Sequence, residues 1–136
     1  MPAYDASLFN PSAPLAKVTL CNQDNGNSKS DVPMLLDTGS DLTLIPQSSA
    51  TQLGLAIDIN QSYELMAFDG KLSTASVVKL DLIFLGRVFR GRYVTVNQEY
   101  GVIGRNILNY LTLLLDGPRS NWREERPSGA KPPPNR

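Results

Sequence analysis

Residues 34–40 of the chain are MLLDTGS, a short apolar run that ends at the carboxylate of Asp37. Such a run is typical of a buried strand, and a carboxylate at the end of a buried strand is costly unless hydrogen bonds satisfy it. Gly39 lets the backbone N–H groups approach that carboxylate, and Thr38 and Ser40 offer hydroxyl groups. The stretch is therefore interpreted as a loop that holds one acid. The tripeptide alone also fits a turn with an Asx-type hydrogen bond.

The segments on either side of this loop predict an all-β domain. Many short strand-like runs are separated by turn signals, which is typical of all-β folds. The predicted strands are 15–21, 32–36, 42–45, 62–68, 71–78, 79–85 and 88–96, and the predicted helices are 48–53 and 105–110. Residues 111–115 either extend the second helix or form a terminal strand. Asp69-Gly70 between two strand-like runs is a strong hairpin signal.

The length of 136 residues allows one compact domain, which we place at residues 15–117. Residues 1–14 contain three prolines and little periodicity, so they predict an extended N-terminal arm. Residues 118–136 are charged and rich in proline, with Trp122 among them. A segment of this composition buries little apolar surface, so a disordered tail is expected there.

The composition excludes several classes of function. The chain has no histidine and a single cysteine, Cys21, so it cannot form an internal disulfide, a His/Cys zinc site or a Ser-His or Cys-His catalytic pair within one chain. Carboxylates remain as the acid–base groups, and no metal or other cofactor is expected. The 13 basic and 13 acidic residues balance, which gives no electrostatic reason to expect a nucleic-acid or membrane partner. Neither a signal peptide nor a membrane-spanning stretch is recognised, so a cytoplasmic location is expected.

Two motifs together resemble the retropepsin family, the retroviral-type single-domain aspartic proteases and their bacterial relatives. The first is LLDTGSD at residues 35–41, and the second is VIGRNIL at residues 102–108. Their order, with a predicted hairpin between them, is much more specific than either motif alone. The resemblance covers about residues 15–116. It implies a closed β-barrel half of the acid-protease fold, with a flap hairpin that closes over a bound peptide.

The resemblance implies a role for each residue of the first motif. Asp37 would be the catalytic aspartate, and Thr38 would hold its counterpart in a second subunit. Gly39 would donate its N–H to the carboxylate, and Ser40 would support the outer carboxylate oxygen. Asp41 would lie beside the substrate backbone.

The resemblance also implies supporting roles outside that motif. Arg105 would pair with Asp41 and brace the site, although both could be ordinary solvated surface charges. Phe68, Asp69 and Gly70 would lie at the tip of the flap, although the same residues also fit an ordinary hairpin. Residues 111–115 resemble the terminal dimer strand of the retroviral enzymes.

The sequence thus predicts an aspartic endopeptidase that acts as a homodimer on an extended peptide or protein substrate. Peptide hydrolysis by this route needs a general base and a general acid, and the chain holds only one Asp-Thr-Gly. A symmetric homodimer would bring Asp37 and its copy together on the two-fold axis. Two alternatives remain open at this point. The chain could be a non-catalytic dimerisation or peptide-binding module that keeps the fold, or a small-ligand β-barrel unrelated to proteases.

Overall fold

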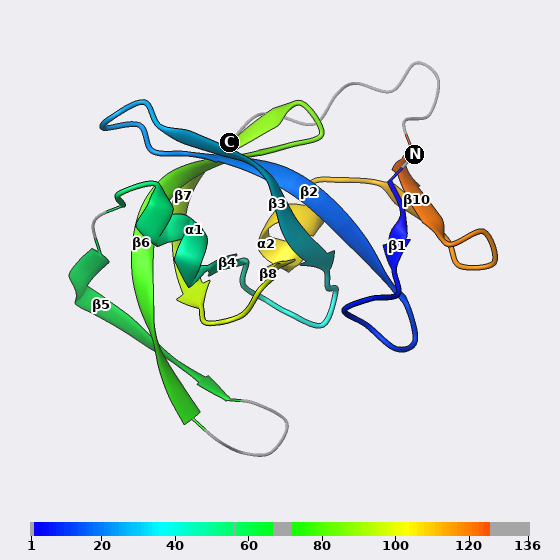
Figure 1. The fold of residues 1–136 in the computed structure, drawn as a ribbon, viewed down its shortest axis with the longest axis horizontal. Helices are drawn as coiled ribbons and strands as arrows, with labels where there is room; N and C mark the ends of the chain where they lie inside the picture. The colour runs from blue at the N-terminus through cyan, green and yellow to red at the C-terminus, as the bar shows by residue number, and fades with distance from the viewer. Residues whose placement is uncertain (1, 56, 67–71, 126–136) are drawn as a thin grey trace.

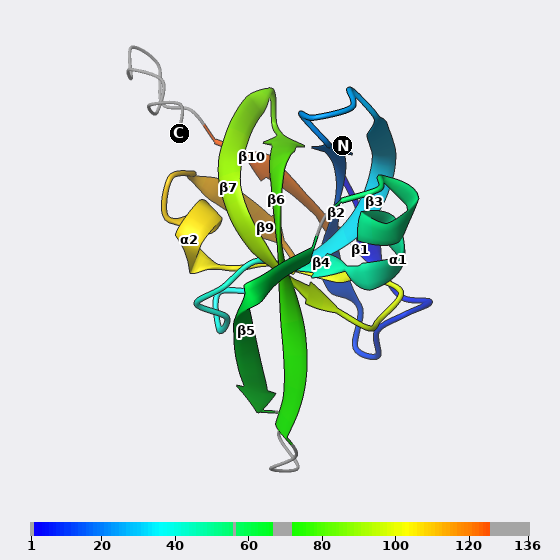
Figure 2. The same cartoon turned by 90° about the vertical axis from the view of Figure 1, so that its left-hand side faces the viewer.

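The computed structural model describes residues 2–55, 57–66 and 72–125 of the chain. Six of its strands pair in a closed ring, because β2 pairs both with β3 and with β6. In order around the ring these strands are β2 (Ala13–Cys21), β3 (Ser28–Leu36), β8 (Gly101–Ile103), β4 (Leu44–Pro46), β7 (Arg87–Val96) and β6 (Leu72–Phe84). Figures 1 and 2 show the resulting barrel from two sides. The prediction of an all-β fold is confirmed.

Two short helices and one long hairpin are attached to this barrel. Helix α1 (Gln47–Gln52) follows β4, and helix α2 (Arg105–Leu108) follows β8, close to the two predicted helices. Strand β5 (Ile57–Met66) pairs with the first half of β6, and this hairpin projects away from the barrel in Figures 1 and 2. The two strands predicted at 71–78 and 79–85 are replaced by one continuous strand, β6 (Leu72–Phe84), because neither Val78 nor Lys79 is a residue that breaks a β ladder.

The barrel encloses a single apolar core to which most strands contribute. The predicted alternation on β6 is confirmed, since Leu80, Leu82 and Phe84 are each at most 3% exposed. Leu20 and Ile103 from opposite parts of the chain are fully buried against them. The core therefore fixes the ends of β3 and β8, which is where both sequence motifs lie.

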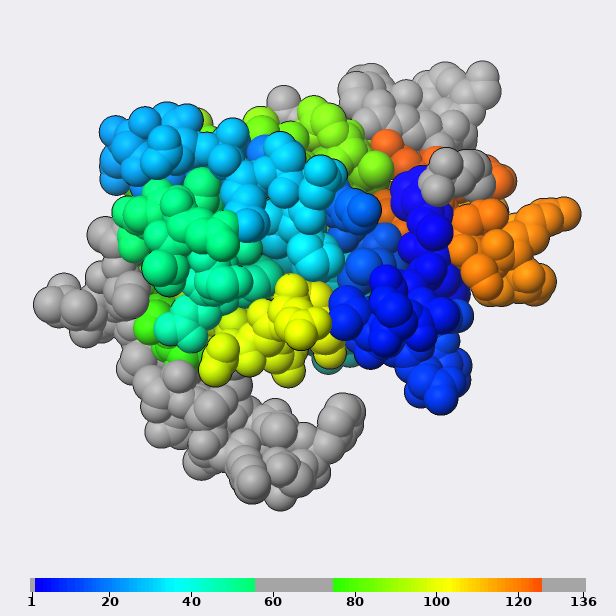
Figure 3. All heavy atoms as spheres, viewed as in Figure 1, coloured from blue at the N-terminus to red at the C-terminus, as the bar shows by residue number. Residues whose placement is uncertain are grey.

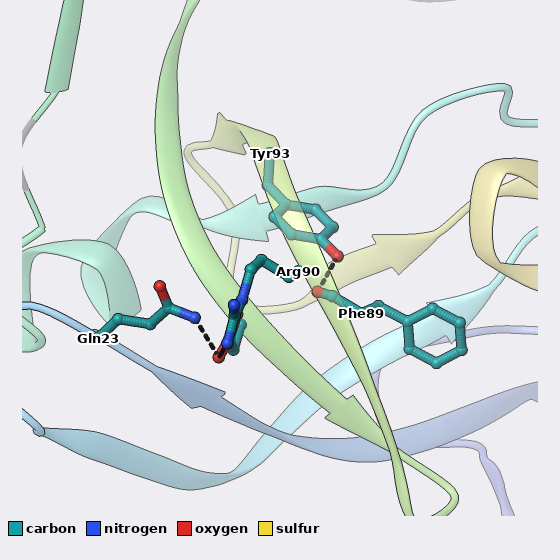
Figure 4. A network of polar contacts seen from close by, with 5 residues as sticks. Gln23, Phe89, Arg90 and Tyr93 are labelled. Atoms are coloured by element: carbon teal, nitrogen blue, oxygen red, sulfur yellow. Dashed lines mark hydrogen bonds and ion pairs between the residues drawn. The ribbon is translucent and has the colours of Figure 1, made fainter. Parts of the chain in front are cut away.

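A polar network ties β6 to β7 on the flank of the barrel. The buried carboxylate of Asp81 accepts hydrogen bonds from Gln23 Nε2 at 2.6 Å and Arg90 Nε at 3.1 Å (Figure 4). Burial alone would raise the pKa of Asp81, but the hydrogen bonds from Arg90 and Gln23 outweigh burial, and the pKa is lowered. In the same figure the Tyr93 hydroxyl donates to the carbonyl of Phe89 at 2.6 Å. Asp81 is thus stabilised in its charged form.

The expected disordered tail is wrong for residues 118–125. Strand β10 (Asn121–Glu124) forms an antiparallel pair with β9 (Leu113–Asp116), so residues 111–115 contribute to a strand rather than to a longer helix. Trp122 is only 1% exposed, and its indole Nε1 donates to the carbonyl of Leu15 at 3.0 Å. Average composition hides this contribution, because one large aromatic ring buries enough surface to anchor a short polar strand. Residues 126–136 lie outside the described part of the chain.

The N-terminal arm is paired rather than free. Strand β1 (Tyr4–Asp5) pairs with the start of β2, and Ala3 forms a bridge with Asn121 of β10. The N-terminal residues, blue in Figure 3, accordingly lie beside the orange C-terminal hairpin. The arm thereby joins the β9–β10 hairpin to the barrel. Among the described residues, no helix combines the length and hydropathy that crossing a membrane requires.

Candidate active site

The Asp37 loop begins where β3 ends, beside the parallel strand β8. Leu36 pairs with Ile103, and the N–H of Asp37 donates to the Ile103 carbonyl at 3.0 Å. The chain then turns sharply, because the N–H of Ser40 donates to the Asp37 carbonyl at 3.2 Å. The N–H of Gly39 donates to Asp37 Oδ1 at 2.8 Å. The half-buried carboxylate therefore receives the backbone hydrogen bond that the sequence predicted, from the predicted residue.

Thr43 connects the segment after this loop to the second motif. Its side chain is buried, and its Oγ1 donates to Asn106 Oδ1 at 2.6 Å and accepts from the Gly104 N–H at 3.1 Å. One hydroxyl thus ties residues that are more than 60 positions apart. This role was not predicted from the sequence. The available signal was a single threonine among the apolar residues 42–45, a pattern that equally fits an ordinary strand.

Gly104 allows the two motifs to lie in direct backbone contact. A Cβ atom at this position would lie 2.2 Å from the carbonyl oxygen of Leu42 and 2.8 Å from that of Ser40. Any side chain here would push the Asp37 loop away from β8. The same contact is closed by the N–H of Arg105, which donates to the Ser40 carbonyl at 2.8 Å.

Arg105 is hydrogen-bonded to the Asp37 loop, but not through the predicted partner. Its guanidinium Nη1 donates to the carbonyl of Thr38 at 2.7 Å. Within the described ranges it forms no ion pair with Asp41, which is exposed. The Thr38 carbonyl lies within hydrogen-bond distance of the guanidinium, and an ion pair with the exposed Asp41 would add little stability.

The expected role of Ser40 also differs in the structure. Its Oγ donates to the Leu42 carbonyl at 2.7 Å, so its one proton serves the loop backbone rather than the Asp37 carboxylate. Thr38 is exposed. The predicted flap-tip residues Phe68, Asp69 and Gly70 lie outside the described residues.

The geometry gives one fixed and accessible carboxylate. The Asp37 loop is held by the hydrogen bond from Asp37 N–H to Ile103 of β8 and by the hydrogen bonds from Arg105 to the carbonyls of Thr38 and Ser40. A carboxylate held in this way can act as a general base or a general acid once a second acid–base group faces it.

The comparisons with known proteins agree with both the fold and the motifs. A family model described as "gag-polyprotein putative aspartyl protease" matches residues 25–110, which is more than half of the chain. A search of curated protein sequences finds no match.

Among solved structures, a retropepsin-like aspartic protease from Rickettsia conorii has a TM-score of 0.56 and is 13% identical, with 85% of this chain and 82% of that chain covered. EIAV protease in complex with the inhibitor HBY-793 has a TM-score of 0.54 and 19% identity, over 71% of this chain and 86% of that chain. A foamy viral protease-reverse transcriptase in complex with double-stranded DNA has a TM-score of 0.50 and 21% identity, over 71% of this chain and 15% of that chain. These likenesses show a shared fold. Together with the family match over both motifs, they establish that this chain belongs to the retropepsin-like aspartic protease family.

Proposed function

We propose that this chain is an aspartic endopeptidase, in which a water molecule is activated by the Asp37 carboxylates of two copies of the chain. The observation that carries the proposal is the hydrogen bond from Gly39 N–H to Asp37 Oδ1, inside a loop fixed by β8 and Arg105. An aspartate with a purely structural role would not need a loop that β8 and Arg105 both hold while Thr38 and Gly39 stay exposed. The family match supports the same chemistry.

The chemistry requires two carboxylates that share one proton. Two close carboxyl groups cannot easily ionise together, and aspartic proteases are the known example of this behaviour. The ionised member takes a proton from the attacking water, and the protonated member donates one to the substrate carbonyl. Since the pair titrates as a unit, cleavage should be fastest at mildly acidic pH. A rate that stays flat from about pH 4 to about pH 9 would count against a shared-proton pair.

The other site residues serve positioning in this proposal. The exposed Thr38 faces its counterpart across the two-fold axis, and the exposed Asp41 lies beside the substrate backbone. The projecting β5–β6 hairpin (Figure 2) serves as the flap in this proposal, and the residues expected at its tip, Phe68, Asp69 and Gly70, lie outside the described residues. The peptide binds in extended form between flap and floor and adds its backbone to the strands around it.

The homodimer in this proposal uses the outer edge of β9. One edge of β9 pairs with β10, whereas the other edge has no strand partner among the described residues. Leu115 on β9 is 53% exposed, more than Leu8 and Val88, the other large apolar side chains that are exposed among the residues whose burial is described. An unpaired edge strand with an exposed leucine is a ready template for a second copy. Antiparallel pairing of β9 with its own copy satisfies two-fold symmetry.

The test of the chemistry compares wild type with Asp37→Asn on a peptide library at several pH values. Asparagine keeps the shape and the acceptor oxygen but cannot act as an acid or base. We expect cleavage by wild type and none by Asp37→Asn, with the same sedimentation coefficient for both. Cleavage that survives in Asp37→Asn sinks the proposal. A wild-type dimer that cleaves nothing favours a peptide-binding module instead.

The test of the dimer replaces Leu115 with glutamate. Two copies of this charge would face each other across the axis in a partly desolvated interface, which opposes association. We expect Leu115→Glu to sediment as a monomer and to lose cleavage together with the dimer. Val88→Glu is the matched control, because Val88 is also an exposed apolar side chain of a strand, at 38%. Equal dimerisation of the two variants would place the interface elsewhere.

A further inference from the structure

The N-terminal segment, residues 2–5, lies between the C-terminal β9–β10 hairpin and the barrel, and both of its edges are hydrogen-bonded. On the side of β10, the N–H of Tyr4 donates to the Ser120 carbonyl at 2.9 Å. The Pro2 carbonyl accepts from the main-chain N–H of Trp122 at 3.1 Å on the same side. On the other side, strand β1 pairs with the start of β2. The segment thus fills the place of a strand between β10 and β2.

The β9–β10 hairpin has no ladder of its own with the barrel. Its strands form a separate two-stranded sheet, and a two-stranded hairpin alone is marginally stable in water. Its other contacts with the barrel are made by side chains, from Trp122 Nε1 to the Leu15 carbonyl and between Arg87 and Glu124. Within the described part of the chain, the main-chain hydrogen bonds that join β10 to the barrel therefore run through the N-terminal segment.

The N-terminal segment also contributes to the burial of Trp122, which is only 1% exposed. Pro2, Ala3 and Tyr4 line the same hollow as this ring. Leu15 links the two, because its N–H donates to the Ala3 carbonyl at 3.4 Å and its carbonyl accepts from the indole at 3.0 Å. Removal of the segment would open the ring to water and free the strand residue that holds the indole.

An exposed loop, residues 6–12, connects the N-terminal segment to β2. Most of its residues are exposed, and it begins with a turn in which Asp5 Oδ1 accepts from the N–H groups of Ser7 and Leu8. Exposed loops of this kind are the preferred sites of proteolytic cuts. A single cut here separates the N-terminal segment from the rest of the chain. The segment then rebinds only as a separate short peptide, without the effective concentration that the loop provides.

We propose that the N-terminal segment is a clasp that holds the β9–β10 hairpin on the barrel, and that its release by a cut in residues 6–12 dissociates the dimer. This inference rests on the proposed function, in which β9 provides the dimer edge. Two copies pair across a two-fold axis only if that edge is held in one orientation. A hairpin that has lost its main-chain contacts with the barrel must be ordered again on association, which weakens binding.

The test inserts an enteropeptidase site, Asp-Asp-Asp-Asp-Lys, between Pro11 and Ser12 of the full chain. The protein is purified in the folded, uncut state, then cut, and the short peptide is removed by gel filtration, so a failure to fold cannot imitate the result. Trp122 is the single tryptophan, so its emission reports on the hairpin, and sedimentation reports on the dimer. We expect the uncut protein to match wild type. After the cut, emission should shift to longer wavelength and the dimer dissociation constant should rise about tenfold or more.

The matched control carries the same site between Gly26 and Asn27, in the turn between β2 and β3. Both strands remain in ladders with β6 and β8 after this cut, so neither emission nor association should change. Unchanged emission after the cut in residues 6–12 overturns the inference, and so does shifted emission with an unchanged dissociation constant. Equal changes after the control cut overturn it as well, because they indicate general loosening of the barrel.

Failure of the proposed dimer is distinguishable from failure of the clasp. A wild-type chain that is monomeric before any cut refutes the dimer and, with it, the control of association. The emission of Trp122 before and after the cut then decides whether the N-terminal segment holds the hairpin.

Discussion

Replacing Gly104 with alanine tests whether backbone contact between the two motifs holds the Asp37 loop. The new Cβ would lie 2.2 Å from the Leu42 carbonyl oxygen, whereas real Cβ atoms essentially never approach closer than 3.0 Å. The carbonyl must therefore retreat by at least 3.0 − 2.2 = 0.8 Å. That movement disturbs two hydrogen bonds, Gly104 N–H to Thr43 Oγ1 and Arg105 N–H to the Ser40 carbonyl.

The expected cost follows from these contacts. Each disturbed hydrogen bond is worth about 1 kcal/mol net, and overpacking adds about 1 kcal/mol or more. We expect Gly104→Ala to lower the free energy of unfolding by about 3 kcal/mol in urea titrations followed by circular dichroism, and to abolish peptide cleavage. Gly91→Ala is the matched control, because a Cβ there meets nothing within 4 Å, and it should stay within about 0.5 kcal/mol of wild type. Equal stability of the two variants would refute the argument that this contact fixes the loop.

Two further predictions concern the charges that join distant strands. Asp81→Asn should lower stability by about 1 kcal/mol near neutral pH, because the carboxylate accepts from Arg90 and Gln23 and its pKa is lowered on folding. That contribution is present above the unfolded pKa of about 3.9 and is lost as the pH falls through the folded pKa. The stabilities of the variant and wild type should therefore converge in acid. The control Asp24→Asn, at an exposed residue, should change stability little. Glu124→Gln should lower the free energy of unfolding by about 2 kcal/mol and shift Trp122 emission to longer wavelength. Arg87 is only 5% exposed, and its Nη2 lies 2.6 Å from Glu124 Oε2, so the variant would leave a buried charge without its ion partner. Glu125→Gln, which affects an exposed pair with Arg123, should cost less than about 0.5 kcal/mol in the same urea titration.

The parts of the fold that were predictable are those that local pattern decides. Leu80, Leu82 and Phe84 belong to the apolar core and alternate with residues that do not, so their burial follows from the two-residue period of a strand. The turn at Gly86 follows equally from local chemistry. None of these features depends on which distant segment packs against them.

The C-terminal hairpin could not be predicted because long-range contacts decide it. Nothing within residues 118–125 shows that Trp122 lies against Phe84 and donates to Leu15, more than 100 positions away. The burial of Arg87 is hidden for the same reason, because its ion partner Glu124 belongs to a segment whose composition suggests disorder. Average composition is a poor guide where one aromatic ring and one buried ion pair provide the anchor.

In the candidate site, too, the sequence predicted which residues belong together better than it predicted which atoms they contact. The sequence predicted that Asp37, Gly39 and Arg105 belong to one site, because Asp37 and Gly39 lie in the first motif and Arg105 lies in the second. It assigned Arg105 the wrong partner, since the choice between the Asp41 carboxylate and the Thr38 carbonyl depends on which of them lies within hydrogen-bond distance of the guanidinium. It missed Thr43 because a hydroxyl in a strand looks the same whether it faces solvent or Asn106.

The way in which the loop is anchored separates stability from chemistry at Asp37. Its main-chain N–H and carbonyl carry two of the loop contacts, and these do not depend on the side chain. The side chain adds one acceptor oxygen for Gly39 N–H, which an asparagine oxygen can replace. The free energy of unfolding of Asp37→Asn should therefore stay within about 0.5 kcal/mol of that of wild type, while Gly104→Ala unfolds at a lower urea concentration. Loss of cleavage in Asp37→Asn at unchanged stability then reports on proton transfer alone, whereas a large loss of stability would mean that the carboxylate is itself part of the scaffold.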